Sequence, residues 1–526
     1  MEFERSSGVL LHVSSLPSRG PIGDLGPAAH EFVSFLAAAK QHIWQVLPLS
    51  PTGYGNSPYA ASSAFAGNPY LISLEVLRDW GWIGAERLNS LPGAERVNTP
   101  AAMGGATDFA RAEEVKLPLL YEAARNFIDH ALDKDKTAAQ WDEFEKFCRD
   151  EAAWLHDFAY YAVLRREFKT GAWNEWPEPF KRRDRKALDD FGAAHGSALV
   201  EEQVLQFAFS QQWDDLREAA ALNGIRILGD IAIFVNMDSA DVWVHPGLFE
   251  LDAELNPIRV AGVPPDYFSK TGQRWGNPLY KWDVLKERGF DWWIDRMRRA
   301  TALYDIVRLD HFRGFEAYWA IPAEEGTAVK GEWVKGPGDA LFKALEGALG
   351  PLPLVAEDLG MITPEVEALR RATGMPGMKV MQFGFSNKGA HPHLPHRYTP
   401  DTVAYTGTHD NDTTLSWLGT ASKTERAAVE AYVGPPGANP VWSLIRAAEA
   451  SVAEMVVIPA QDLLELGSQA RMNTPSVPAG NWSWRAPAGA WSAEIAARLA
   501  ALAEVTDRDN DPLGEDEPER GQSAKQ

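Results

Sequence analysis

Ile306-Val-Arg-Leu-Asp-His-Phe-Arg-Gly-Phe315 is the stretch around which the rest of this chain is arranged. Its first five residues predict a buried strand, and side chains along a strand alternate between two faces. Arg308 and Asp310 therefore share one face. An arginine two residues from a carboxylate favours the ionised form, although such a pair also occurs as an ordinary structural ion pair. An ionised aspartate at the carboxyl end of a strand suits nucleophilic attack on the anomeric carbon of a sugar.

Seven further apolar runs predict strands that alternate with helices. Together with the first, the expected strands cover residues 8–13, 43–47, 225–235, 306–310, 352–356, 378–383, 402–406 and 455–458. Helical patterns occupy most of the intervals, for example 28–40, 282–303, 364–373, 423–433 and 440–453. Eight strands with alternating helices predict a (β/α)8 TIM barrel, in which the carboxyl ends of all the strands meet at one mouth.

The length of 526 residues exceeds an average domain, but a TIM barrel with insertions can use it as one unit. We expect residues 1–505 to form this barrel. Residues 77–223 are mainly helical in pattern and predict an inserted subdomain, whereas residues 236–280 predict a substrate loop. After the eighth strand there is room only for a loop, a helix and a tail, so we expect no C-terminal β-sandwich domain. The acidic, polar residues 506–526 predict a disordered tail.

Composition excludes several kinds of partner. A formal net charge of −22 would repel the phosphates of nucleic acids and of anionic membranes, which leaves a neutral substrate as the best fit. Cys148 is the only cysteine, so an intrachain disulfide and a cysteine metal cluster are both excluded. The sequence contains no apolar run of about 18 residues, and we expect a cytoplasmic protein without a membrane partner. Asp507-x-Asp509 begins like a calcium loop, but Pro512 stands where that loop requires glycine, so no metal site is expected.

Three acidic residues follow strands that end at the same mouth of the predicted barrel. They are Asp310, Glu357 and Asp410, from the fourth, fifth and seventh strands. Without cysteines or a histidine-ligand motif, these carboxylates favour acid–base and covalent chemistry over a metal site. Two carboxyl groups about 5 Å apart perform retaining glycoside chemistry, one as the nucleophile and the other as acid and then base.

The neighbours of these acids suggest a role for each. Asp310 lies beside Arg308 and is the better anion, so we assign it as the nucleophile. Glu357 has no positive neighbour in sequence, and the charge of Asp310 should raise its pKa until it keeps the proton it must donate. Asp410 would then stabilise the distorted sugar in the transition state, and His409 can donate a hydrogen bond to a sugar.

Two further residues have both a structural and a functional interpretation. Asp230 lies in the otherwise apolar third strand, where it could neutralise Arg308 across the barrel, contact a sugar, or do both. Trp275 could belong to the core, but its place in a segment rich in glycine and proline favours stacking on a sugar ring. The long loop after the second strand holds aromatic residues at a mouth where ligands bind.

Several motifs in the same order resemble those of glycoside hydrolase family 77, the 4-α-glucanotransferases called amylomaltase or disproportionating enzyme, within the α-amylase superfamily. The matching stretches run from about residue 8 to residue 485. They are Leu11-His-Val-Ser-Ser-Leu-Pro17, Pro51-Thr-Gly-Tyr-Gly-Asn-Ser-Pro-Tyr59, Gly229-Asp-Ile-Ala-Ile-Phe-Val235, residues 264–278, Arg308-Leu-Asp-His-Phe-Arg-Gly314, Ala356-Glu-Asp-Leu-Gly360, Thr408-His-Asp-Asn-Asp-Thr413, Arg471-Met-Asn-Thr-Pro475 and Asn481-Trp-Ser-Trp484.

The resemblance implies the same three catalytic roles and adds sugar-binding residues. These are Tyr59, Asp230, Gln273, Trp275, Arg308 and His409, with Tyr54 as a secondary glucan contact. The implied reaction passes a segment of an α-1,4-glucan donor to the 4-hydroxyl of glucose or of a maltooligosaccharide, by double displacement and without a cofactor. A monomer or weak homodimer is expected.

Two other functions remain open at this point. A retaining α-1,4-glucan hydrolase would use the same carboxylates in a wetter site, because transfer requires that the acceptor reach the intermediate before water does. The expected absence of a C-terminal β-sandwich favours the transferase. A non-catalytic glucan-binding barrel is the third reading, and the complete set of three acids argues against it.

Overall fold

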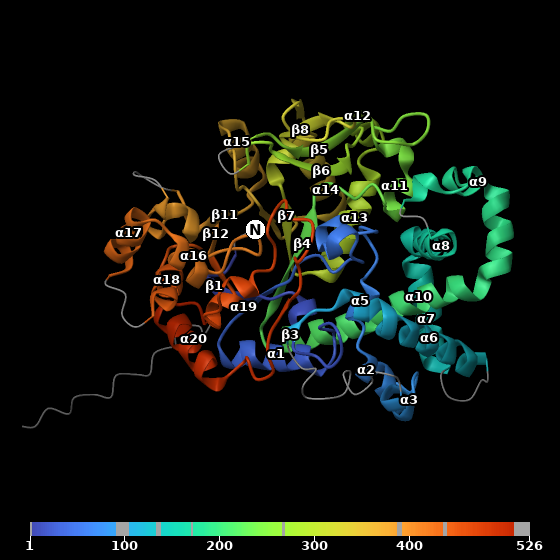
Figure 1. The fold of residues 1–526 in the computed structure, drawn as a ribbon, viewed down its shortest axis with the longest axis horizontal. Coiled ribbons are helices and arrows are strands. Elements are labelled where there is room, and N and C mark those ends of the chain that lie inside the picture. The colour runs from blue at the N-terminus through green and yellow to red at the C-terminus, as the bar shows by residue number, and fades with distance from the viewer. Residues whose placement is uncertain are drawn as a thin grey trace, which may run out of the picture.

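The computed structural model describes residues 3–90, 105–132, 138–169, 172–265, 269–386, 392–434 and 439–509. Eight parallel strands form one sheet at its centre, in the order β10-β7-β4-β2-β1-β13-β12-β11 (Figure 1). Their bounds are β1 (Ser6–Leu10), β2 (Ile43–Gln45), β4 (Arg226–Ala232), β7 (Ile306–Asp310), β10 (Leu354–Ala356), β11 (Gly377–Val380), β12 (Thr402–Tyr405) and β13 (Met455–Pro459). Between β10 and β11 the Ala356 N–H donates to the Pro376 carbonyl at 2.9 Å. The sheet is a nearly closed barrel, which confirms the predicted TIM fold.

The barrel strands are short and apolar because both of their faces are covered. Every residue of β1, β2, β10, β12 and β13 is buried. The covering helices include most of those predicted from the sequence pattern. They are α1 (Pro27–Ala38), α12 (Trp282–Glu287), α13 (Asp291–Leu303), α14 (Asp339–Leu349), α15 (Pro364–Thr373), α16 (Thr414–Thr420), α17 (Lys423–Val433), α18 (Pro440–Glu449), α19 (Ala460–Leu463) and α20 (Ala493–Val505).

The segment between β2 and β4 is mainly helical, and its helices α6 to α10 lie on the side of the barrel opposite α16 to α20 (Figure 1). Its elements are α2 (Leu74–Asp79), α3 (Ala85–Ser90), β3 (Gly105–Ala106), α5 (Phe109–Arg111), α6 (Leu117–Leu132), α7 (Ala138–Asp150), α8 (Ala152–Phe168), α9 (Glu178–Lys181) and α10 (Arg185–Leu222). Strand β3 pairs with β14 (Trp484–Arg485) near the end of the chain. The division of the chain into a barrel and an inserted subdomain stays a prediction.

The segment predicted as a substrate loop at 236–280 is more ordered than a loop. It contains α11 (Ala240–Val244), β5 (Arg259–Val263) and β6 (Gln273–Pro278). With β8 (Ala317–Pro322) and β9 (Glu332–Lys335) these strands form an antiparallel sheet in the order β6-β5-β8-β9. Strand β6 carries glycine, asparagine and proline, which disfavour a strand locally, so its pairing partners decide its structure.

The end of the chain packs on the barrel further than predicted. Arg508 is fully buried, four described residues extend past the expected boundary at 505, and the Thr506 carbonyl accepts a hydrogen bond from Arg5 Nε at 2.8 Å. Of the tail predicted at 506–526, residues 510–526 lie outside the described residues. Among the residues that are described, no helix has the length and apolar character needed to span a membrane.

Candidate active site

Arg308 joins two carboxylates at the mouth of the barrel. It lies on β7 opposite Asp230 of β4, and its Nη1 atom is 2.5 Å from Asp230 Oδ2 and 2.9 Å from Asp310 Oδ1. Burial works against the charge of Arg308, but the two carboxylates raise its pKa above the usual value. The expected pairing of Asp230 with Arg308 is therefore present. The same guanidinium also pairs with Asp310, so it bridges the two carboxylates.

Glu357 follows β10 directly and is held by backbone amides. The His311 N–H donates to Oε2 at 2.8 Å and the Leu359 N–H donates to Oε1 at 3.0 Å. Burial and the nearby charge of Asp310 raise the pKa of Glu357 to about 8, although Arg308 and these two hydrogen bonds oppose the shift. At neutral pH the Glu357 carboxyl therefore keeps a proton beside Asp310.

Asp410 and His409 lie in the turn after β12 and meet Tyr59 from the loop after β2. The Tyr59 hydroxyl donates to Asp230 Oδ2 at 2.8 Å, and its ring stacks on His409 with centroids 5.2 Å apart and an interplanar angle of 18°. Burial lowers the pKa of His409, so its imidazole is neutral at pH 7. The His409 ring is buried, whereas the Asp410 side chain keeps 48% of its area exposed.

Gln273 and Trp275 lie on β6, at the rim of this cluster. The Trp275 indole N–H donates to Gln273 Oε1 at 3.2 Å. The Trp275 and His311 rings are nearly perpendicular, with centroids 4.8 Å apart. Trp275 keeps 39% of its surface exposed, which leaves a face for a ligand. Tyr54 is 78% exposed and, among the described residues, no hydrogen bond or ring contact joins it to the cluster.

Sequence reasoning missed three residues that support the cluster. His311 has a left-handed backbone, with φ 55°, which turns its N–H toward Glu357. Asn473 donates from Nδ2 to Asp410 Oδ1 at 2.6 Å, and Arg471 donates from Nη2 to the Asp410 carbonyl at 2.6 Å. The last two belong to a motif that the sequence analysis matched without giving its residues a role, because their partner lies about sixty positions away.

The chemistry of the cluster follows from its charges. One carboxylate pairs with an arginine, a second carboxyl keeps its proton, and a third lies exposed across the mouth. Within the described parts of the chain, no group of three or more histidine, cysteine, aspartate or glutamate residues is arranged to hold a metal ion. Fold and site together are those of a barrel enzyme that acts on glycosidic bonds.

Comparison with known proteins identifies the family. The family model described as 4-α-glucanotransferase, glycoside hydrolase family 77, matches residues 11–490. The chain is 48% identical to the 4-α-glucanotransferase of Thermus thermophilus, over 97% of this chain and 100% of that one. It is 42% identical to a chloroplastic/amyloplastic 4-α-glucanotransferase of Solanum tuberosum, over 92% and 82% of the two chains. A solved structure, amylomaltase from Streptococcus agalactiae in complex with acarbose, aligns with a TM-score of 0.90 at 37% identity, covering 96% of this chain and 100% of that one.

The chain therefore belongs to glycoside hydrolase family 77, and it is an enzyme of the 4-α-glucanotransferase type. The resemblance inferred from the sequence motifs is confirmed. The assignment of individual residues to steps of the reaction is not given by these comparisons and rests on the geometry above.

Proposed function

We propose that Asp310, Glu357 and Asp410 carry a retaining double displacement on an α-1,4-glucan. The observation that supports this most directly is the contrast between the two carboxyls: Arg308 Nη1 lies 2.9 Å from Asp310 Oδ1, while burial and the charge of Asp310 raise the pKa of Glu357 to about 8. Two carboxyls in this arrangement provide a nucleophile and a proton donor in the same site.

In the first step, an oxygen of Asp310 attacks the anomeric carbon and Glu357 donates its proton to the glycosidic oxygen. The bond to the leaving fragment breaks, and the donor segment remains as an ester of Asp310. In the second step, the 4-hydroxyl of the acceptor gives its proton to the Glu357 carboxylate and attacks the same carbon, which frees Asp310. Both steps pass through an oxocarbenium-like state, whose sugar hydroxyls Asp410 and His409 would bind.

The remaining predicted residues would hold the two substrates. Tyr59, Asp230 and His409 surround the sugar that is transferred, and Trp275 with Gln273 at the rim would hold the acceptor. An acceptor bound there excludes water from the covalent intermediate, so that transfer outruns hydrolysis. Tyr54, at the surface, would contact a glucan chain further out. We place the reaction in the cytoplasm, in a monomer or weak homodimer.

The test is incubation with maltotriose and, in parallel, maltoheptaose, following chain lengths and total reducing ends together. Longer and shorter maltooligosaccharides with nearly constant reducing ends are expected, since each transfer breaks one glycosidic bond and makes another. Rising reducing ends without longer products would instead make the chain a hydrolase. No change with either substrate would contradict both reactions.

A further inference from the structure

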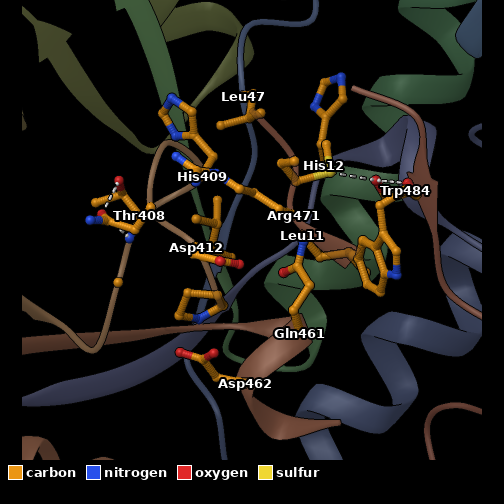
Figure 2. A pocket seen from close by; sticks show the side chains of 16 residues that line it. Leu11, His12, Leu47, Thr408, His409, Asp412, Gln461, Asp462, Arg471 and Trp484 are labelled. Atoms are coloured by element: carbon orange, nitrogen blue, oxygen red, sulfur yellow. Dashed lines mark hydrogen bonds between the residues drawn. The ribbon is translucent and has the colours of Figure 1, made fainter. Parts of the chain in front are cut away.

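The turn that carries His409 and Asp410 has packed side chains on one side, where Tyr59 and Trp482 lie against His409, and a pocket on another. The pocket is lined by residues 407–409, 411 and 412 of the turn and by residues from the ends of β1 and β13. Figure 2 shows Thr408, His409 and Asp412 on one side of this space and Gln461 and Asp462 below it. On the side of the pocket, hydrogen bonds therefore contribute to the position of the turn.

Asp462 lies in α19, directly after β13, and supplies such hydrogen bonds. Its Oδ2 atom accepts from Thr406 Oγ1 at 2.7 Å and from Thr414 Oγ1 at 2.6 Å, while Oδ1 accepts from the Thr414 N–H at 2.7 Å. Thr406 follows β12 and Thr414 begins α16, so the two threonines stand immediately before and after residues 407–413. One carboxylate thus ties together both ends of the seven-residue turn.

The turn has other contacts besides those of Asp462. Gln382 Nε2 donates to the Asp412 carbonyl at 3.0 Å, the Asn473 N–H donates to the His409 carbonyl at 3.0 Å, and Asn473 and Arg471 bind Asp410 as described above. Asp462 differs from these because it binds both ends of the turn. Asn411 Oδ1 accepts from the Thr408 N–H and Oγ1, both at 2.9 Å, and these bonds shape the turn without fixing it to the barrel. Ser468 donates to Asp412 Oδ2 at 2.7 Å, but this pair is exposed. Asp462 is 2% exposed, and a hydrogen bond sheltered from water is the stronger constraint.

We propose that Asp462 is a positioning residue for catalysis, which holds the turn so that Asp410 and His409 face the sugar beside Asp310. Asp462 itself does not touch the substrate. The proposal rests on the role given above to Asp410, because a misplaced turn affects the reaction only if Asp410 takes part in it. A displacement of about 1 Å in such a group can slow a reaction about 100-fold.

The test is a double-mutant cycle on purified, folded protein. We expect Asp462→Ala to lower kcat about 10- to 100-fold, with a much smaller change in the KM for maltotriose, since the lost interaction acts in the transition state. In an Asp410→Asn background the same substitution should cost less than about threefold, because two changes that act through one group are not additive. Asp462→Asn should recover most of the activity, since its amide can satisfy both threonines in the same shape.

The matched control is Glu449→Gln. This substitution alters a buried carboxyl at the end of α18, before β13 begins, and should leave kcat unchanged. If Asp462→Ala does not fold, Thr414→Val takes its place in the cycle, since it removes one donor to Asp462 and leaves the carboxylate. Additive losses in the Asp410→Asn background, or a lowered melting temperature with unchanged kcat, would overturn the proposal. An Asp410→Asn enzyme with full activity would overturn the role of Asp410 as well, so the two failures are distinguishable.

Discussion

The two ends of the barrel both hold buried charges, but they use them in opposite ways. At the base, Arg508 forms an ion pair with Glu449 at 3.2 Å, and both side chains are almost completely shielded from water. The Arg508 guanidinium donates to five backbone carbonyls, those of Ser6, Glu449, Ser451, Ala453 and Glu454. At the mouth, Arg308 is equally buried, but its partner Asp310 keeps 30% of its side chain exposed.

A raised pKa is common to both ends and so does not by itself mark function. Burial raises the pKa of Glu449 to about 7, much as it contributes to the value of about 8 at Glu357. The two ends differ in whether a ligand can reach their charged groups. The base is closed by its own backbone, and its charges tie the end of the chain to β1 and to the turn before β13. The mouth leaves Asp310, Trp275 and Asp410 open to a ligand, and only there can a perturbed carboxyl act on a substrate.

The most direct test of this difference is to replace one carboxyl at each end of the barrel. Glu357→Gln should lower kcat on the order of 10²–10⁴-fold, since an amide keeps the size of the side chain but cannot donate the proton to the leaving group. Glu449→Gln should leave kcat unchanged when rates are corrected for the folded fraction. Maltotriose kinetics and circular dichroism of both variants provide the comparison, and binding of an oligosaccharide should survive Glu357→Gln. Similar kinetic losses in the two variants would remove the distinction between the ends.

For stability we expect the opposite: charges at the base of the barrel should matter more than those at the mouth. Arg508→Met leaves Glu449 buried without its partner, a change that costs about 3–5 kcal/mol of stability. Arg508→Met with Glu449→Met removes both charges and should recover part of that loss, although the five carbonyls stay without their donor. Calorimetric melting temperatures measure both effects, and kcat at a low temperature should stay near that of the unmodified enzyme. A strong fall in kcat of the folded Arg508→Met protein would show that a change at the base of the barrel affects the reaction at the mouth.

The contrast also explains what could be predicted from the sequence. Asp310, Glu357 and Asp410 could be proposed from the sequence because each lies at or shortly after the end of an apolar run, and the barrel gives such positions a shared mouth. The sheet of β5, β6, β8 and β9 was missed, since its strands pair across long separations and β6 has a poor local propensity. Arg508 was assigned to a disordered tail because acidic, polar residues surround it in the sequence. Its burial depends on carbonyls from both ends of the chain, which no local pattern reveals.

The supporting contacts of the site were hidden for a similar reason. The left-handed backbone of His311 has no signal in its side chain, yet it turns the N–H toward Glu357. Asn473 and Asp462 act on the turn at 407–413 from positions about fifty to sixty residues away. Sequence patterns identify groups that perform chemistry more readily than groups that position them, since positioning is a property of the assembled fold.

The smallest expected effect concerns pH, and its sign follows from the direction of the shift at Glu357. The reaction needs this carboxyl protonated, and its pKa in the free enzyme is raised to about 8. We therefore expect kcat/KM to be flat just below pH 8 and to fall about tenfold for each pH unit above it, because kcat/KM reports groups of the free enzyme. The raised pKa also means that stability decreases as pH rises from the unfolded value of 4.5 through 8, since in this range the unfolded chain has lost the proton that the folded protein still holds. Glu449→Gln should leave the alkaline limb of kcat/KM in place, because its carboxyl has no access to the substrate. A limb that moved with Glu449→Gln would place the controlling ionisation at the base of the barrel and contradict the role of Glu357 as the acid.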